Sequence, residues 1–368
     1  MKQTGTQASK KPLRTGVLVL FAVLAAVSAI GFALRDAIAE RVLLGVVERN
    51  IGTDVRAELP DGLHVFLCGT GSPMPDITRA GPCTAVLAGD RAFVFDSGAG
   101  SVRKLALMRF PVGSTEALYL THLHSDHIDG LGETMLQIWI GGSLRRNTPI
   151  YGPIGTSRVA EGFNDAYQID AGYRLAHHGP EIADLGGFGL DPRELVLEGD
   201  SEVVFERGEV RITAFRVHHD PVEPAFGYRI DYKDRSVVIS GDTTYDENLV
   251  DVAAGCDLLV HEALNMELIE AMEELARERG ATSIEKILFD IRDYHTSPVD
   301  AARAAEASKA KALVLTHIVP PLPTPLLNGR FTRGMDAEYT GAITVGVDGL
   351  LLSLPAGSEE IVKEQLLR

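Results

Sequence analysis

The chain has 368 residues, of which 45% are hydrophobic and 23% charged, and its formal net charge at pH 7 is −16. This composition is typical of a globular protein with a sizeable core, and it excludes a disordered or low-complexity chain. The length fits one large α/β domain with an appendage. Three cysteines, Cys68, Cys83 and Cys256, are odd in number and lack C-x-x-C spacing. We therefore expect small buried apolar residues there, and neither a disulfide framework nor a thiolate zinc site.

The N-terminal segment differs from the rest of the chain. Four basic residues precede "GVLVLFAVLAAVSAIGFAL", the 19 uncharged residues at 16–34. At about 1.5 Å per residue, a helix of this length nearly crosses a bilayer core of about 30 Å. A cleaved signal peptide is the alternative, but its apolar part would normally span only about 7–15 residues. We predict a basic cytoplasmic tail at 1–15, a transmembrane anchor at 16–34 and a juxtamembrane segment at 35–60.

Charge suggests both an orientation and a class of partner. Basic residues before the span favour an N-terminus in the cytoplasm, which predicts a single-pass inner-membrane protein whose catalytic domain is periplasmic or otherwise extracytoplasmic. Without the four basic residues of the tail, 31 basic residues face 51 acidic ones, so residues 35–368 carry a net charge of −20. Such a surface repels polyanions, and no lysine or arginine cluster lies outside the tail, so nucleic acid is not expected as a partner.

Residues 61–355 alternate short β-branched runs with helical patterns, which predicts one layered α/β domain followed by a C-terminal tail at 356–368. In the predicted helix at 297–310, Ser297 is expected as N-cap and Pro298 as the first helical residue. Many of the strands end at a histidine or an aspartate, where ligands of α/β sheets tend to bind. The predicted helices are 101–110, 266–280, 283–294 and 297–310, and the predicted strands are 63–68, 84–89, 91–96, 116–121, 210–217, 226–232, 235–241, 256–261, 311–317 and 341–347.

The stretch "THLHSDHIDG" at 121–130 is the densest group of titratable residues. His122 and His124 alternate at a strand end and so point to one side, while Asp126 and His127 follow where the chain turns into a helix. Imidazole and carboxylate ligands without sulfur suit Zn²⁺, although Mn²⁺ or Fe²⁺ could occupy the same set. A pair of metals needs about six or seven protein ligands. The prediction therefore extends to residues at other strand ends, namely His219, Asp242 and His317.

These motifs, in this order, resemble those of metallo-β-lactamase-fold hydrolases, in the branch that contains ribonuclease Z and arylsulfatase-like or phosphodiesterase-like enzymes. The resemblance covers about residues 61–350 through "LCGTGSP", "FDSGAG", "THLHSDHIDGL", "HHDPVEPAFGYRI", "SGDT", "HEA", "YHTSPVDAA" and "LTH". It implies a four-layer αββα sandwich with two Zn²⁺ ions. One ion is assigned His122, His124 and His219, the other Asp126, His127 and His317, and Asp242 bridges them. The family pattern favours His219 over its neighbour His218.

The resemblance also implies catalytic roles. His295, just before a helix start, corresponds to the family's histidine that contacts the scissile group and can protonate the leaving oxygen. Asp126 could share in handling the proton of the bridging hydroxide. Asp96, together with His261 and Glu262, is expected to orient ligand histidines. The catalytic set is therefore Asp126, His295 and Glu262.

Two departures from ribonuclease Z bear on the substrate. Between "FGYRI" and "SGDT" the chain has only a hairpin's length, where similar bacterial ribonuclease Z enzymes carry a long arm that grips tRNA. A charged helical insertion at 264–293 could cap the site or form a homodimer contact. The expected function is a membrane-anchored binuclear zinc hydrolase of a small-molecule phosphodiester or sulfate ester. The alternatives are a cytoplasm-facing ribonuclease Z that processes tRNA 3′ ends and a lactonase-type hydrolase of the same fold.

Overall fold

The structure, a computed structural model, describes residues 11–367 of the chain. Most of the predicted basic tail, residues 1–10, and the final residue of the predicted C-terminal tail lie outside the described residues. The chain divides into two units, Met1–Thr53 and Asp54–Arg368, which are described separately.

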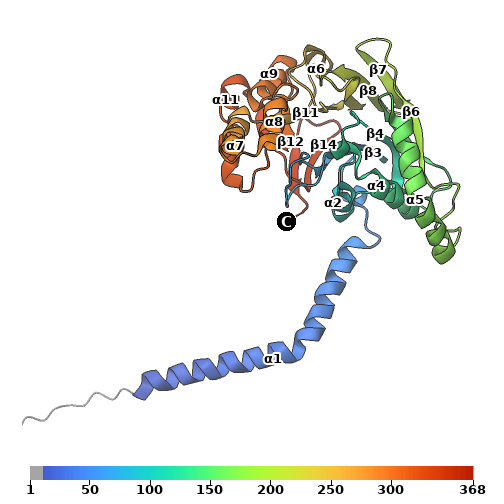
Figure 1. Cartoon of the computed structure of the whole chain (residues 1–368). Helices are drawn as coiled ribbons and strands as arrows, with labels where there is room; N and C mark the ends of the chain where they lie inside the picture. Colours follow the sequence, from blue (N-terminus) through green and yellow to red (C-terminus); the bar gives the residue numbers. More distant parts are fainter. Residues whose placement is uncertain (1–10, 368) are drawn as a thin grey trace, which may run out of the picture. The chain divides into compact units, whose positions relative to one another are not determined.

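The first unit consists mainly of one long helix, α1 (Lys11–Asn50). Its segment Gly16–Glu48 contains a window of mean hydropathy 2.8, none of which is buried (Figure 1). By length and composition this helix can cross a membrane. A signal sequence near an N-terminus would satisfy the same criteria, so the finding establishes an exposed apolar helix that extends beyond the predicted span.

The second unit is built on two mixed β-sheets (Figure 1). Strands β3 to β6 pair in parallel in the first sheet, as do β10 to β13 in the second. In spatial order the first sheet contains β15 (Val362–Gln365), β14 (Leu350–Pro355), β1 (Gly62–Gly69), β2 (Cys83–Ala88), β3 (Arg91–Phe95), β4 (Thr115–Tyr119), β5 (Thr148–Gly152) and β6 (Leu190–Glu194). The second contains β13 (Ala342–Val345), β12 (Ala312–Val319), β11 (Leu258–Leu264), β10 (Arg235–Ile239), β9 (Ala225–Tyr232), β8 (Val210–Val217) and β7 (Ser201–Arg207).

The main core lies between the two sheets. Alternate residues of β1, such as Leu63 and Val65, meet side chains of the second sheet, such as Ile230 and Val260, in one buried cluster. This alternation follows from the two-residue period of a strand, which sends successive side chains to opposite faces. The other face of each sheet therefore also has to be covered.

Helices cover both outer faces and complete four layers in the order α, β, β, α. The first sheet packs against α2 (Ser101–Leu107), α4 (Leu131–Gly142) and α5 (Thr156–His178). The second packs against α6 (Glu247–Val252) and α9 (Pro298–Ser308). Helix α9 begins as predicted: the Ser297 side chain accepts a hydrogen bond from the Asp300 amide and Pro298 is the first helical residue. The predicted four-layer αββα architecture is thus confirmed.

The expectation for two of the cysteines is wrong. Cys68 and Cys83 form a disulfide bond, with a Cα–Cα distance of 5.1 Å, whereas Cys256 is free and buried. The pair is 15 residues apart in sequence, but β1 and β2 are antiparallel neighbours, and Gly69 is paired with Cys83 after a register shift. The antiparallel pairing of β1 with β2 brings the two thiols together. The number and spacing of the cysteines in the sequence do not predict this pairing.

Candidate metal centre

The first group of predicted ligands gathers where β4 and β8 end. The short helix α3 (Ser125–Ile128) starts directly after His124. Nε2 of His122 lies 2.9 Å from Nδ1 of His124, and Nε2 of His219 lies 3.3 Å from the same Nδ1. These three nitrogens and a carboxylate oxygen of Asp242 all lie within 4.8 Å of one another. Four side chains from three separate segments therefore converge on one point.

The second group lies beside the first and shares Asp242. The Asp242 Oδ2 atom is 3.3 Å from Nε2 of His127, 3.2 Å from Nε2 of His317 and 3.9 Å from Nε2 of His122. Oδ2 of Asp126 is 3.3 Å from Nε2 of His317. One carboxylate thus faces histidines of both groups, which is the geometry that a bridging ligand requires.

Close backbone contacts determine where Asp126 lies. A Cβ atom on Gly98 would lie 2.4 Å from the carbonyl oxygen of Asp126 and 2.3 Å from the carbonyl carbon of Gly81. Only glycine permits this approach. The backbone of the segment "FDSGAG" therefore packs directly against the backbone of helix α3, and this close contact explains why Gly98 is a glycine.

Asp96 orients the second group through hydrogen bonds. Its Oδ2 atom lies 2.8 Å from Nδ1 of His127 and accepts a hydrogen bond from Oγ1 of Thr121, and its Oδ1 atom accepts one from the Thr121 amide. A histidine that donates through Nδ1 keeps a lone pair on Nε2, which makes that nitrogen available to a metal. Sequence reasoning missed Thr121, although its place at the head of "THLHSDH" could have signalled a supporting role.

The first group is oriented by a backbone carbonyl. Nδ1 of His219 donates to the carbonyl oxygen of Tyr294 over 2.9 Å, so its Nε2 lone pair faces His124. The Tyr294 ring also packs edge-on against His219, with ring centroids 5.1 Å apart. This contact was not predicted, because Tyr294 lies 75 residues from His219 in the sequence.

The donor set fits divalent cations. Nε2 of His127 is buried and has no hydrogen-bond partner among the described residues, although it faces two carboxylates. A buried, unpaired nitrogen costs free energy unless a ligand satisfies it. The clustered histidine and aspartate side chains are the ligand types that divalent cations such as Zn²⁺ take.

Electrostatics around Asp242 favour positive charge. Burial alone would raise the pKa of Asp242, but His317 and His127 outweigh it and hold that pKa well below its usual value. Burial would likewise lower the pKa of His127, yet Asp242 and Asp96 raise it well above its usual value. By contrast, burial lowers the pKa of His219 to about 4. The site therefore stabilises a cation between its carboxylates and keeps His219 in the neutral form that ligates metals.

His295 and Glu262 lie together at the edge of the centre. Nδ1 of His295 is 3.2 Å from Oε1 of Glu262, which also accepts a 2.7 Å hydrogen bond from the amide of Thr296. A ring nitrogen of His295 lies within 4.8 Å of a carboxylate oxygen of Asp242 and of a ring nitrogen of His317. The neighbouring His261 is fully buried, and its Nδ1 donates to the carbonyl oxygen of Glu262. Glu262 thus contacts the ring of His295 directly, whereas His261 supports the backbone beside it.

The predicted insertion at 264–293 forms a helical pair beside the site. Helices α7 (Met266–Glu278) and α8 (Thr282–Asp290) pack together, and their apolar cluster includes Val319 at the end of β12 and the partly buried Met74. The segment that follows α8 carries Tyr294 and His295. The packed helices therefore support the segment that carries these two residues.

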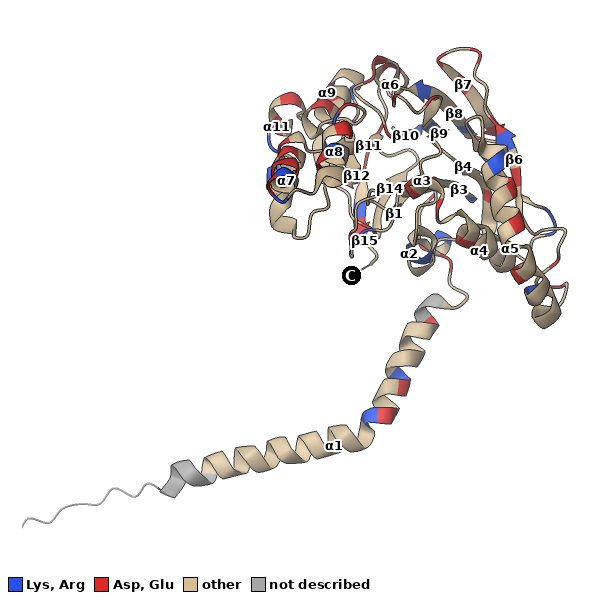
Figure 2. Ribbon diagram, viewed as in Figure 1, with Lys and Arg blue, Asp and Glu red and all other residues tan. Residues whose placement is uncertain are grey.

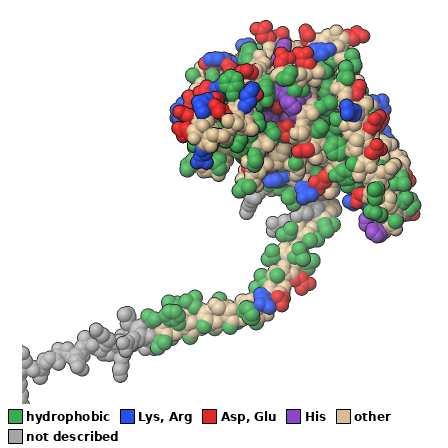
Figure 3. Space-filling view, viewed as in Figure 1, with side chains coloured by type: hydrophobic (Ala, Val, Ile, Leu, Met, Phe, Trp, Pro, Cys, Tyr) green, Lys and Arg blue, Asp and Glu red, His purple; other side chains and the backbone are tan. Residues whose placement is uncertain are grey.

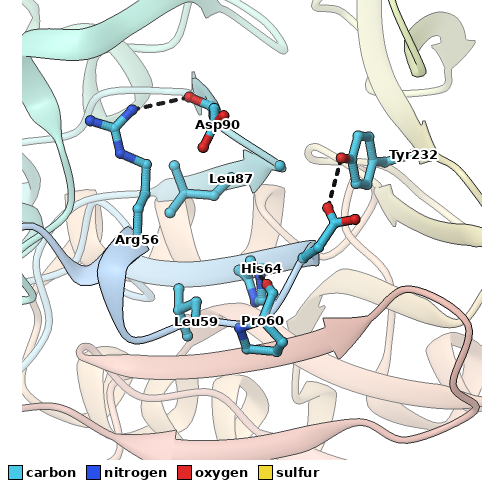
Figure 4. A pocket seen from close by; sticks show the side chains of 9 residues that line it. Arg56, Leu59, Pro60, His64, Leu87, Asp90 and Tyr232 are labelled. Atoms are coloured by element: carbon cyan, nitrogen blue, oxygen red, sulfur yellow. Dashed lines mark hydrogen bonds between the residues drawn. The ribbon is translucent and has the colours of Figure 1, made fainter.

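His64 lies outside the cluster of proposed ligands. His64 lines a cavity of about 280 Å³ near the start of β1 (Figure 4), where its ring is hydrogen-bonded to Ser353 and to the carbonyl oxygen of Pro60. In the same cavity Tyr232 donates to Asp61, and Arg56 donates to the carbonyl oxygen of Asp90 (Figure 4). These polar groups satisfy one another, which indicates a structural role.

Comparisons with known proteins agree with this geometry. Residues 91–318 match the family described as the beta-lactamase superfamily domain. The ribonuclease Z of Mycolicibacterium gilvum (strain PYR-GCK) is 40% identical over 262 residues, which are 71% of this chain and 85% of that protein. The ribonuclease Z of Mycobacterium bovis (strain BCG / Pasteur 1173P2) is 36% identical over 288 residues, which are 78% of this chain and 96% of that protein.

Solved structures share the fold. The short form of human tRNase Z superposes with a TM-score of 0.57 at 23% identity, covering 79% of this chain and 99% of that one. The metallo-beta-lactamase fold protein YhfI from Bacillus subtilis gives a TM-score of 0.54 at 21% identity, with the same coverage of 79% and 99%. Both likenesses concern the arrangement of the two sheets and their helices.

The expected partner class is wrong. We expected a small-molecule ester substrate and no nucleic-acid partner. This expectation conflicts with the two relatives named ribonuclease Z, whose lengths the alignments cover to 85% and 96%. The error came from net charge, which sums over the whole surface, whereas acidic and basic residues are interspersed on this unit (Figure 2). It also ignored the charge of the metals themselves, which are the largest local charges in such a site.

Proposed function

Because the chain belongs to the ribonuclease Z family of the beta-lactamase superfamily, we propose that this metal-dependent hydrolase cleaves a phosphodiester bond of RNA. The observation that carries the proposal is the convergence of seven donor side chains, Asp242 among them, in a chain that matches a ribonuclease Z over 96% of that protein's length. A tRNA precursor is the first RNA to test, because the relatives at 40% and 36% identity are named ribonuclease Z.

Two metal positions are proposed, with zinc as the first choice and manganese or iron(II) as alternatives. His122, His124 and His219 would hold one ion, Asp126, His127 and His317 the other, and Asp242 would contact both. When bound, such cations lower the pKa of water and neutralise charge on a phosphate group. The support is the mutual distances of these side chains and the hydrogen bonds that leave ring nitrogens free.

His295 is the proposed proton donor to the leaving oxygen. Its ring is 7% exposed, and Glu262 behind it accepts from Nδ1, so Nε2 is the atom left for the substrate. Burial lowers the pKa of His295, but a phosphate group in the site would favour the protonated ring. Glu262 positions that ring, and Asp126 accepts protons beside its role as a ligand.

We further propose that α1 anchors the enzyme in a membrane and that the second unit lies outside the cytoplasm. Positive charge before the apolar segment supports this orientation. The Cys68–Cys83 disulfide supports it independently, because such bonds persist in oxidising compartments and are rare in the cytosol. A homodimer contact through 264–293 stays a prediction.

The chemistry is tested with the full chain in detergent, loaded with zinc. A tRNA precursor, an unstructured RNA, bis(p-nitrophenyl) phosphate and an acyl-homoserine lactone serve as substrates. We expect RNA cleavage that a chelator abolishes and added metal restores. Asp242→Ala should lose turnover, whereas Glu274→Ala, on the exposed face of α7, should retain it. Hydrolysis of the lactone alone would refute the proposal.

Orientation is tested separately. Alkaline phosphatase fused to the C-terminus of the full chain is active only outside the cytoplasm, and green fluorescent protein fused there serves as the cytoplasmic reporter. We expect an active phosphatase fusion. An inactive phosphatase with a fluorescent counterpart would reverse the orientation and leave the RNA chemistry standing.

A further inference from the structure

A second cavity opens beside the metal centre. It has a volume of about 500 Å³ and is formed by residues that follow β5 and β6, by the end of β8 and by the start of β9. Two of its residues connect it to the centre. His218 directly precedes His219 in the chain, and Ile154 directly precedes Gly155, which lies against Leu123 between His122 and His124. The lining of the cavity is therefore directly connected along the chain to two segments that carry proposed ligands.

The walls of the cavity are apolar and open to solvent. Ile154 is 62% exposed and Val196 is 70% exposed, and the other apolar lining residues are Leu195, Val217, Pro224 and Ala225. Large β-branched side chains on loops contribute little to a core when they are this exposed. Their grouping in one concave surface is typical of a ligand site.

The polar rim disfavours a phosphate group. The carboxylates of Asp200 and Glu223 border the cavity and would repel an anion. Of the two basic side chains in the lining, Arg216 uses Nε and Nη2 to donate to the carbonyl oxygens of Gly199 and Leu197, and His218 is paired with Asp246. Carboxylates do accept hydrogen bonds from the N–H groups of a nucleobase, and the flat faces of a base pack well on aliphatic walls.

We propose that this cavity binds the base of the nucleotide next to the cleaved bond. The inference rests on the proposed RNA substrate and adds a subsite for one unpaired base, bounded by Ile154, Val196, Val217 and Pro224. Histidine side chains are visible on the face of the molecule that Figure 3 shows, and the cavity is lined by residues that adjoin the segments of His124 and His219 in sequence.

The test is a double-mutant cycle between protein and RNA. The full-length Ile154→Ala/Val196→Ala variant is compared with wild type on an RNA and on two copies of it that carry an abasic nucleotide on the 5′ or the 3′ side of the cleaved bond. For wild type, we expect one abasic substrate to lose about tenfold in kcat/KM. The variant should lose a similar factor on the intact RNA and nothing further on that abasic substrate. Val203→Ala, which is 44% exposed on β7, is the matched control and should behave as wild type.

A binding measurement separates this proposal from the proposed function. Fluorescence anisotropy with the His295→Ala protein reports affinity for the same RNAs without turnover, and the Ile154 and Val196 substitutions are added to that background. Equal losses on the abasic RNA with and without those substitutions would refute the subsite, even if RNA is cleaved. Preserved discrimination between intact and abasic RNA by an enzyme that cleaves no RNA would refute the function and retain the subsite.

Discussion

The Asp96→Asn substitution tests the orienting network most directly. Asp96 has a positive φ of 57°, a conformation that asparagine also adopts, so the change removes the charge without straining the backbone. The asparagine oxygen can still accept from the Thr121 amide, but its NH₂ group would face Nδ1 of His127, which now lies 2.8 Å from a carboxylate oxygen. Two donors would then oppose each other. His127 would be driven to the tautomer that carries its proton on Nε2, where it cannot ligate a metal.

Loss of such a supporting hydrogen bond typically costs about 10- to 100-fold in metal affinity, or about 1.4–2.7 kcal/mol. The assay is competition for zinc against a chelator of known affinity, with the full chain in detergent, and turnover measured at saturating zinc. Asp129→Asn is the matched control, because Asp129 is exposed and lies two residues after His127. If Asp96→Asn binds zinc within twofold of wild type, the carboxylate does not set the tautomer of His127, and the reasoning fails.

Three further predictions concern the scaffold. Cys68→Ala/Cys83→Ala should lower the free energy of unfolding by about 3 kcal/mol relative to the oxidised wild type, because the bridge spans a separation of 15 residues, and urea unfolding of the reduced wild type should give the same value as the variant. Burial lowers the pKa of His261 to about 4, below an unfolded value of about 6.5, so the unfolded chain binds the extra proton and stability falls by about 3 kcal/mol as the pH drops from 7 to 4. His261→Asn should lack this part of the pH dependence, and an unchanged slope would contradict it. Gly98→Ala should destabilise the fold by about 1–3 kcal/mol and weaken metal binding, because the added Cβ would collide with backbone atoms. Gly162→Ala in α5 is the control, because its Cβ would have no neighbour within 4 Å, and it should be neutral or stabilising. Thermal unfolding scans of both variants measure the difference.

Part of the donor cluster could be predicted because four of its members lie at or near the ends of strands whose own pattern is strong, namely His122, His219, Asp242 and His317. His122 follows β4 of the first sheet and His317 lies near the end of β12 in the second, and the ends of strands in α/β sheets are where ligands tend to bind. The prediction thus needed only local periodicity and chemistry. The roles of these residues as ligands remain proposals until metal binding is measured.

Other features depend on contacts between distant segments and have no local signal. The bond from His219 to the Tyr294 carbonyl and the Cys68–Cys83 bridge both follow from tertiary pairing. Helix α5 was missed for a different reason: only Thr156, Ala160 and Ala171 are buried, so its exposed sequence shows little apolar periodicity. Strand β6 has a proline and three charged residues, which is a weak strand pattern.

Strand β15 has a consequence for handling the protein. It adds the exposed segment Val362–Gln365 to the edge of β14, whose residues Leu350–Leu354 are buried. Lys363 and Glu364 thereby place charges on the outermost edge, a common protection against pairing with other chains. A truncation at Pro355 would uncover an apolar edge, and such a shortened chain should fold and yet aggregate, so crystallisation efforts should retain the C-terminal residues.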